Sequence, residues 1–398
     1  MPDSDDAPKV TILGKLFILL VLAGCGWAAW RFLAPALGTA KPTTTPTATG
    51  GTTPLPSVAS GDQVRITLAY GTEKERWLKW AVEELAKSEP GIAITLVPKG
   101  TIDAAQALNA GERYHIWAPA SSLYVPTFSA DWQLKQGKPP FLRTETLALT
   151  PMVFVWWQER FAALKQPPND FRDLAKLLAE PTGWAGLAGK PEWGFLKFGH
   201  THPNQSNSGL MALILMAHDY HQSRTLAMAQ VMDAPFQGWL ATLEKGIAGL
   251  PASTGSMMKD MVLKGPSAYD GVCVYESVAI DFLTNAQGRW GDLRITYPTP
   301  NIWSDNPAYI IDATWSDPAQ RAAAGKVLDF LMSTPAQQAA LKHGLRPGDP
   351  AVAVRGAGSP FTDYERYGLK VEVPTMVEPP SPEVVQNLLV GWQRAVGR

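Results

Sequence analysis

From Val64 onward, short strand patterns alternate with amphipathic helical patterns. Residues 64–68 are apolar at every second position, which is typical of a strand with one buried face. Residues 78–85 then carry apolar side chains at helical spacing, Pro90-Gly91 ends that helix, and residues 92–96 repeat the strand pattern. A strand, a helix and a strand in this order form a βαβ unit, which implies a parallel sheet with a right-handed crossover. The fold class is therefore predicted to be α/β.

The alternation continues to the C-terminus, and the chain is long enough for two such sheets. We expect further strands at 114–118, 147–157 (broken at Pro151), 193–198, 272–274 and 309–311, and helices at 104–111, 171–180, 210–220, 320–332, 336–343 and 381–396. The part after residue 62 is long for a single sheet of this kind and comfortable for two lobes.

Three helix starts follow expected strands and could approach a ligand. Thr72 and Glu75 have the spacing of a capping box, Ser206-Asn207-Ser208-Gly209 opens the helix at 210–220, and Ser121-Ser122 follows the strand at 114–118. Ligands of open α/β sheets bind beyond the carboxyl ends of the strands, where helix N-termini leave backbone N–H groups unpaired. Taken singly, each of these segments is better interpreted as an ordinary helix cap; it is their occurrence together that points to a ligand.

The N-terminal region differs from the rest of the chain. An apolar run from Leu16 to Trp30 extends to 21 residues if it is counted from Val10, which is enough to span a membrane. We predict an uncleaved membrane anchor. The alternative is a lipoprotein signal, because Leu22-Ala23-Gly24-Cys25 resembles a lipobox, although the sequence stays apolar after Cys25. A Thr/Pro-rich linker follows and cannot bury a core.

Composition excludes several classes of function. The 35 Lys and Arg residues balance the 36 Asp and Glu residues, so no electrostatic footprint for nucleic acid is present. Two cysteines allow no cysteine-built zinc site. The His200/His202 and His218/His221 pairs have metal-ligand spacing, but surface or turn positions are the better interpretation, and we expect no metal or cofactor. Most of the 15 Trp residues, Trp77, Trp80, Trp156 and Trp157 among them, are expected in the core.

One set of motifs suggests an enzyme and is rejected. Ser256-Met257-Met258-Lys259, Ser304-Asp305-Asn306 and Lys342-His343-Gly344 occur in the order of the three motifs of penicillin-interacting serine enzymes. The third motif should lie on a strand, whereas residues 336–343 have a helical pattern. The spacing between the motifs is also too tight, so we expect no enzyme activity.

Four segments in order resemble a known family. They are the turn Gly71-Thr72-Glu73-Lys74, the stretch from Phe198 to Leu210, the stretch Val274-Tyr275-Glu276-Ser277-Val278-Ala279, and the closing segment from Asp317 to Pro347. Together they resemble extracellular solute-binding proteins of the type 2 periplasmic-binding fold. The nearest resemblance is to a membrane-anchored subfamily related to molybdate- and sulfate-binding proteins, some members of which carry a von Willebrand A domain.

The resemblance implies two α/β lobes joined by crossing strands, with a small solute held between them for an ABC-type transporter. The implied partners are a solute or oxyanion, the membrane, and a transporter permease or a protein with a von Willebrand A domain; the main domain would be extracytoplasmic. The alternative function is a scaffold or sensor in an extracytoplasmic assembly. The expected division is 1–36 for the anchor, 37–62 for the linker, 63–150 for the first part of lobe I, 151–300 for lobe II, and 301–398 for the return to lobe I with the C-terminal helices.

We expect the ligand between the starts of the helices on the two lobes. The candidate ligand-binding residues are Gly71, Thr72, Glu73, Ser121, Ser122, Ser206, Asn207, Ser208, Gly209, Tyr275 and Glu276. An oxyanion is the first candidate ligand, and a cationic or zwitterionic organic solute is the second. If Glu73 and Glu276 both line the cleft, they oppose a bare anion by like-charge repulsion.

Overall fold

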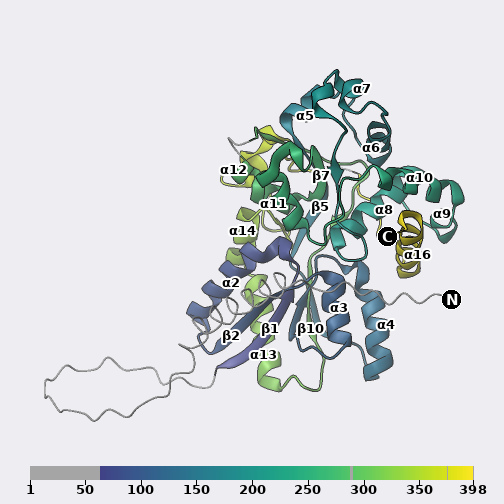
Figure 1. Cartoon of the computed structure of the whole chain (residues 1–398). Helices are drawn as coiled ribbons and strands as arrows, with labels where there is room; N and C mark the ends of the chain where they lie inside the picture. Colours follow the sequence, from purple (N-terminus) through teal and green to yellow (C-terminus); the bar gives the residue numbers. More distant parts are fainter. Residues whose placement is uncertain (1–62, 287–289, 374, 398) are drawn as a thin grey trace, which may run out of the picture. The chain divides into compact units, whose positions relative to one another are not determined.

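The computed structural model describes residues 63–286, 290–373 and 375–397, which belong to one compact unit with two α/β lobes (Figure 1). The predicted anchor (1–36), the linker (37–62) and Cys25 lie outside the described residues. Within the described part, no helix combines the length and the apolar character that crossing a membrane requires. The predicted two-lobed α/β architecture is confirmed.

The first lobe is built on a five-stranded sheet with the order β2-β1-β3-β10-β4. Its strands are β1 (Val64–Tyr70), β2 (Ile92–Pro98), β3 (Ile116–Ala118), β4 (Phe141–Thr146) and β10 (Pro307–Ile311). Its helices are α2 (Glu75–Ser88), α3 (Thr101–Asn109), α4 (Val125–Gln136), α13 (Pro318–Leu331) and α14 (Thr334–Lys342), with the short 3₁₀ turns η2 (Thr72–Lys74) and η3 (Ser122–Tyr124). β1 pairs in parallel with β2 and β3, as the βαβ pattern predicts, and β10 is antiparallel to its neighbours.

The alternation along β1 explains why this sheet has helices on both faces. Ile66 and Leu68 pack with Trp77 of α2 and with residues of α13 in one buried cluster. Ala69, the residue after Leu68, belongs to the cluster on the opposite face, which contains Trp117 and residues of α3 and α4. Figure 1 shows α2 and α13 on one side of the strands and α3 and α4 on the other. Successive strand residues point to opposite faces, so both faces of β1 are covered.

The second lobe is built on a sheet with the order β11-β5-β7-β6, and β8 and β9 also pair with β5. Its strands are β5 (Ala148–Trp157), β6 (Phe198–Gly199), β7 (Gly271–Tyr275), β8 (Leu293–Thr296), β9 (Trp303–Ser304) and β11 (Arg346–Pro347). Its helices are α5 (Gln158–Ala163), α6 (Phe171–Leu178), α7 (Trp184–Ala188), α8 (Asn207–His221), α9 (Met228–Val231), α10 (Ala234–Lys245), α11 (Thr254–Lys264), α12 (Glu276–Ala286), α15 (Pro360–Asp363) and α16 (Pro382–Val396), with the 3₁₀ turns η4 (Pro191–Trp193), η5 (Gly265–Ser267) and η6 (Glu365–Tyr367).

β5 and α8 form the centre of the second lobe's core. Residues 152–157 of β5 are at most 1% exposed, and residues 210–217 of α8 are fully buried. Trp77, Trp156 and Trp157 are core residues, as predicted, whereas Trp80 is half-buried. The predicted break of β5 at Pro151 is wrong. Pro151 pairs with Trp303 of β9 at the point where β5 exchanges one partner strand for another, so its missing N–H does not interrupt the strand.

Two other local expectations need correction. Thr72 and Glu75 do not form a capping box, because residues 72–74 form η2 and α2 begins only at Glu75, without a side-chain cap. The expected return of 301–398 to the first lobe applies to β10, α13 and α14, but β11 pairs with β5, and α16 packs against α9 and α10 of the second lobe.

Candidate functional site

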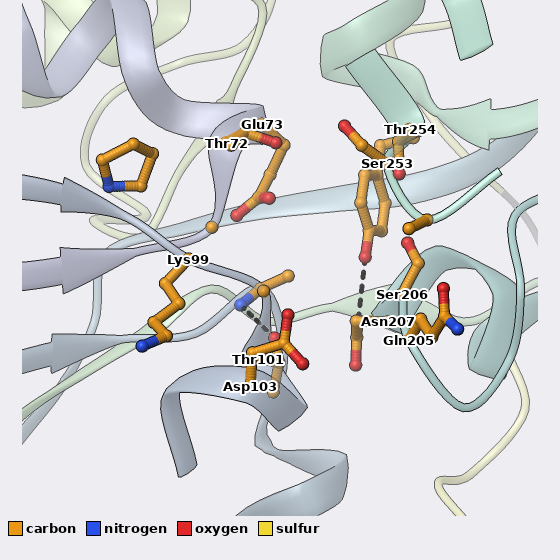
Figure 2. Close-up of a pocket in the computed structure, with 16 residues that line it drawn as sticks. Thr72, Glu73, Lys99, Thr101, Asp103, Gln205, Ser206, Asn207, Ser253 and Thr254 are labelled. Atoms are coloured by element: carbon orange, nitrogen blue, oxygen red, sulfur yellow. Dashed lines mark hydrogen bonds between the residues drawn. The ribbon is translucent and has the colours of Figure 1, made fainter. Parts of the chain in front are cut away.

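A pocket of about 250 Å³ lies where helices of both lobes begin (Figure 2). Ligand pockets for drug-sized molecules are commonly about 300–1,000 Å³, so this one suits a smaller solute. Its lining residues are Gly71, Thr72, Glu73, Pro98, Lys99, Gly100, Thr101, Asp103, Ala120, Gln205, Ser206, Asn207, Ala252, Ser253, Thr254 and Tyr275.

Three α-helices start at the wall of this pocket. The helices are α3 of the first lobe and α8 and α11 of the second, and each contributes residues from its first turn. The N–H groups of Thr101, Asn207 and Thr254 have no hydrogen-bond acceptor among the residues that the structure describes. Such groups are free to bind a ligand and carry the positive end of the helix dipole. The geometry is that of the ligand crevice in open α/β proteins.

Glu73 contributes a buried carboxylate on the first-lobe side of the pocket. One of its oxygens, Oε1, accepts a hydrogen bond from the ammonium of Lys74, which also donates to Pro119 O (3.0 Å) and to Asn306 Oδ1 (2.9 Å). Burial lowers the pKa of Lys74, and the charge of Glu73 opposes that shift. A Cβ added at Gly71 would lie 2.4 Å from Glu73 Oε1, so only glycine lets the carboxylate fold back against the pocket wall.

Asn207 links the two lobes beside the pocket. Its Oδ1 accepts a hydrogen bond from Ser121 Oγ at 2.8 Å, and its amide nitrogen donates to the Tyr275 hydroxyl at 2.9 Å. Ser121 follows β3 of the first lobe, whereas Tyr275 ends β7 of the second. Burial, and secondarily the charge of Glu73, raises the pKa of Tyr275 well above its usual value, so its hydroxyl stays protonated.

A group of hydroxyls behind the wall fixes the start of α8. Ser208 Oγ lies 2.6 Å from both Thr201 Oγ1 and Thr254 Oγ1, and 3.2 Å from Ser206 Oγ. A Cβ added at Gly209 would lie 2.1 Å from the Thr201 carbonyl oxygen. Ser208 and Gly209 therefore hold α8 against the preceding turn and against α11.

The structure brings six of the eleven predicted site residues into one lining: Gly71, Thr72, Glu73, Ser206, Asn207 and Tyr275. Ser121 lies behind Asn207, and the backbone N–H of Ser122 donates to Asp305 Oδ1 at 2.8 Å. Ser208 and Gly209 support the wall as described above. None of these four residues belongs to the pocket lining.

Glu276 is held in a separate buried ion pair. Its Oε2 lies 2.7 Å from Arg346 Nε, its Oε1 lies 2.8 Å from Arg346 Nη2, and the hydroxyl of Tyr297 also donates to it. Glu276 is fully buried, and Arg346 is 5% exposed. The carboxylate therefore joins α12 to β11. The expectation that Glu276 lies alongside the ligand is corrected, because it is not among the residues that line the pocket.

Sequence reasoning missed the pocket residues on α3 and α11. The helical pattern is visible in the sequence only from residue 104, whereas α3 begins at Thr101 and has the acidic residue Asp103 in its first turn. Ser253 caps α11 by accepting a hydrogen bond from the N–H of Ser256. A Ser at the N-cap, three residues before another polar residue, was the signal available in the sequence.

The residues of the rejected enzyme motif serve other purposes. Ser256 and Lys259 are exposed on α11, and Asn306 accepts a hydrogen bond from Lys74. Lys342 ends α14, which confirms the helical interpretation of this segment.

The histidine pairs contact protein groups. His200 lies between Thr201 O (2.8 Å) and Glu244 Oε1 (3.2 Å), and the ring of His202 meets Trp392 edge to face. His218 and His221 approach backbone carbonyls at the end of α8. Among the described residues, no group of three or more potential metal ligands is present.

Comparisons with solved structures show the same fold at low sequence identity. A periplasmic thiamin-binding protein aligns with a TM-score of 0.63 and 16% identity, covering 87% of this chain and all of the other. Iron-bound HitA from Pseudomonas aeruginosa aligns with a TM-score of 0.57 and 15% identity, covering 84% of this chain and all of the other. The sulfate-binding protein SubI from Mycobacterium tuberculosis H37Rv aligns with a TM-score of 0.53 and 16% identity, covering 82% of this chain and 96% of the other.

The sequence itself identifies the family. No protein of curated function matches the sequence significantly. The profile of the bacterial extracellular solute-binding proteins matches residues 66–346, which is more than half of the chain and includes both sheets and the pocket. The main domain is accordingly extracytoplasmic and is of the periplasmic binding type. The chain belongs to the bacterial extracellular solute-binding protein family.

Proposed function

We propose that this protein captures a small solute in the pocket between its lobes and delivers it to an ABC-type transporter, while residues 1–36 tether it to the membrane. The observation that carries the proposal is the convergence of α3, α8 and α11 on one pocket, with unpaired N–H groups from both lobes. A solute held by both lobes favours their closed arrangement, which a transporter can then recognise.

The proposed ligand contacts are the six predicted residues that line the pocket, together with Thr101, Asp103, Ser253 and Thr254. Ser121, Ser122, Ser208 and Gly209 are proposed to position them. The Ser121–Asn207 hydrogen bond would help to hold the lobes together, because it joins groups of different lobes.

Solute capture is tested by identifying what copurifies with the full chain. The protein is purified in mild detergent and denatured, and the released small molecules are compared with those from Ser206→Trp. Ser206 lines the pocket and is 7% exposed, so the larger side chain would fill the space. We expect a solute enriched with the parent and lost in the variant. A variant that folds and still carries the same solute would contradict the proposed site.

The tether is tested by fractionation of cells that express the full chain. We expect the protein in the membrane fraction, with an unchanged location and mass for Cys25→Ala if residues 10–30 form an uncleaved anchor. Loss of a lipid-sized mass in Cys25→Ala would favour the lipoprotein alternative. Full-length protein free in the periplasm would refute both.

A further inference from the structure

The two sides of the pocket differ in how their helix starts are charged. On the first lobe, η2 and α3 carry an acidic residue in the first turn, Glu73 and Asp103. On the second lobe, α8 and α11 have no acidic residue there. A carboxylate in the first turn offsets the positive end of its own helix, so the partial positive charge remains uncompensated only on the second lobe.

The second-lobe side is therefore suited to anionic oxygens. The N–H groups of two lining residues, Asn207 on α8 and Thr254 on α11, have no acceptor among the described residues. α8 has 15 residues and α11 has 11, so both are long enough to carry a full dipole. Carboxylate or phosphate oxygens are the ordinary ligands of such N-termini.

The first-lobe side requires the opposite chemistry. The side chain of Glu73 is only 5% exposed, and Figure 2 shows its carboxylate directed into the pocket. Lys74 uses Glu73 Oε1 and finds two further acceptors away from the pocket, while Oε2 has no hydrogen-bond partner in the described part of the chain. An ionised carboxylate only accepts hydrogen bonds, so the ligand atom that meets Oε2 must be a donor.

Asp103 strengthens this preference, and the nearby Lys99 does not reverse it. Asp103 is an exposed carboxylate of the lining. The Lys99 ammonium lies 3.0 Å from Glu112 Oε2 and 3.1 Å from the Tyr114 hydroxyl, and Figure 2 shows it directed away from the other labelled residues. A proton-free oxyanion such as sulfate or molybdate would face Glu73 and Asp103 with nothing to donate.

We propose that the solute is a small zwitterion of the amino-acid class, with its carboxylate at the starts of α8 and α11 and its ammonium at Glu73 and Asp103. This inference rests on the proposed function of the same pocket, and it names the chemical class of the solute. The volume of about 250 Å³ agrees with a molecule of this size.

The inference is tested by calorimetric titration of the full chain in mild detergent after extensive dialysis. The probes are the twenty L-amino acids, sulfate, molybdate, phosphate and spermidine. We expect at least one amino acid to bind, with no binding of the oxyanions or the polyamine. The same amino acid with its amine acetylated, or with its carboxylate amidated, should bind at least tenfold more weakly.

Pocket variants connect this result to the structure. Glu73→Gln should weaken amino-acid binding tenfold or more, because it removes a charge-assisted acceptor. Asp103→Asn, which breaks no hydrogen bond or ion pair among the described residues, should weaken it threefold or more and remains informative if Glu73→Gln fails to fold. Glu83→Gln on α2 is the matched control, because this exposed carboxylate lies outside the lining, and binding should be unchanged.

The outcomes separate this inference from the proposed function. Binding of an oxyanion or of spermidine alone, abolished by Ser206→Trp, would overturn the zwitterion and leave solute capture intact. Amino-acid binding that is unchanged in both Glu73→Gln and Asp103→Asn would also overturn it. If no probe binds, the amino-acid class is refuted; if in addition no solute copurifies, solute capture itself fails.

Discussion

Replacing Arg346 by Met should destabilise the protein severely, because it isolates the buried charge of Glu276. Two nitrogens of Arg346 contact the two oxygens of that carboxylate at 2.7 and 2.8 Å, and neither side chain has appreciable contact with solvent. Arg346 also donates to the carbonyl oxygens of Lys370 (2.6 Å) and Val371 (2.5 Å), so its loss leaves several acceptors unpaired.

The expected cost is about 3–5 kcal/mol, which is typical of removing one partner from a buried ion pair. The double variant Glu276→Gln/Arg346→Met should lose less than Arg346→Met alone, because no isolated charge remains. The matched control is Lys79→Met, which breaks an exposed pair with Glu75 on α2, where the lysine side chain is 60% exposed. Exposed pairs of this kind contribute roughly 0.2–1 kcal/mol.

The assay is urea unfolding of the full chain, with the free energy of unfolding extrapolated to water. Arg346→Met should shift the transition midpoint far more than Lys79→Met. Equal losses in the two variants would refute the ion-pair argument. If Glu276→Gln instead left stability unchanged and altered solute binding, Glu276 would be a ligand-binding residue, contrary to its position in the structure.

Two further predictions concern the core and the wall of the pocket. Gly209→Ala should destabilise the protein and weaken solute binding, because the new methyl group would meet the Thr201 carbonyl oxygen. The control Gly238→Ala in α10 meets no atom within 4 Å and should increase the free energy of unfolding by about 0.5–1 kcal/mol. Thermal melting compares the two variants. Burial raises the pKa of Asp219 from 3.8 to about 8, so the folded state holds a proton that the unfolded state has lost, and stability falls as pH rises between these values. Between pH 5 and 8, the free energy of unfolding of Asp219→Asn should fall by less than that of the parent, and the difference should be at least about 1.4 kcal/mol, the equivalent of one pKa unit. The same fall in parent and variant would contradict the assigned shift.

The sequence predicted the elements because their patterns are local. The alternation in β1 and the helical spacing in α2 are set by which faces are buried, and both faces of this sheet are covered. The break expected at Pro151 is wrong because the sequence around the proline does not show which strands pair there. A proline breaks a central strand only where its N–H would have met a partner, and the partners of β5 change at that residue. Such a change depends on strands more than a hundred residues away.

The sequence predicts where the glycines and serines of the pocket lie, but not which carboxylates face the pocket. The segments around Gly71 and Ser206 are recognisable because small residues at helix starts have a local signature. The direction of a carboxylate has no such signature. Glu73 and Glu276 each lie within three residues of the end of a strand and are alike in the sequence, but the partner of Glu276 is 70 residues away in β11.

The comparison of these two carboxylates shows what makes a buried charge available to a ligand. Arg346 is bidentate and uses both oxygens of Glu276, and Tyr297 donates to the same group, which is fully buried away from the pocket. Lys74 is a single point donor that uses one oxygen of Glu73 and spends its other protons on Pro119 and Asn306. The second oxygen of Glu73 therefore has no hydrogen-bond donor among the described residues and remains open on the pocket side. The single contact from Lys74 thus leaves one oxygen of Glu73 for the proposed ligand, whereas the planar fork of Arg346 occupies both oxygens of Glu276.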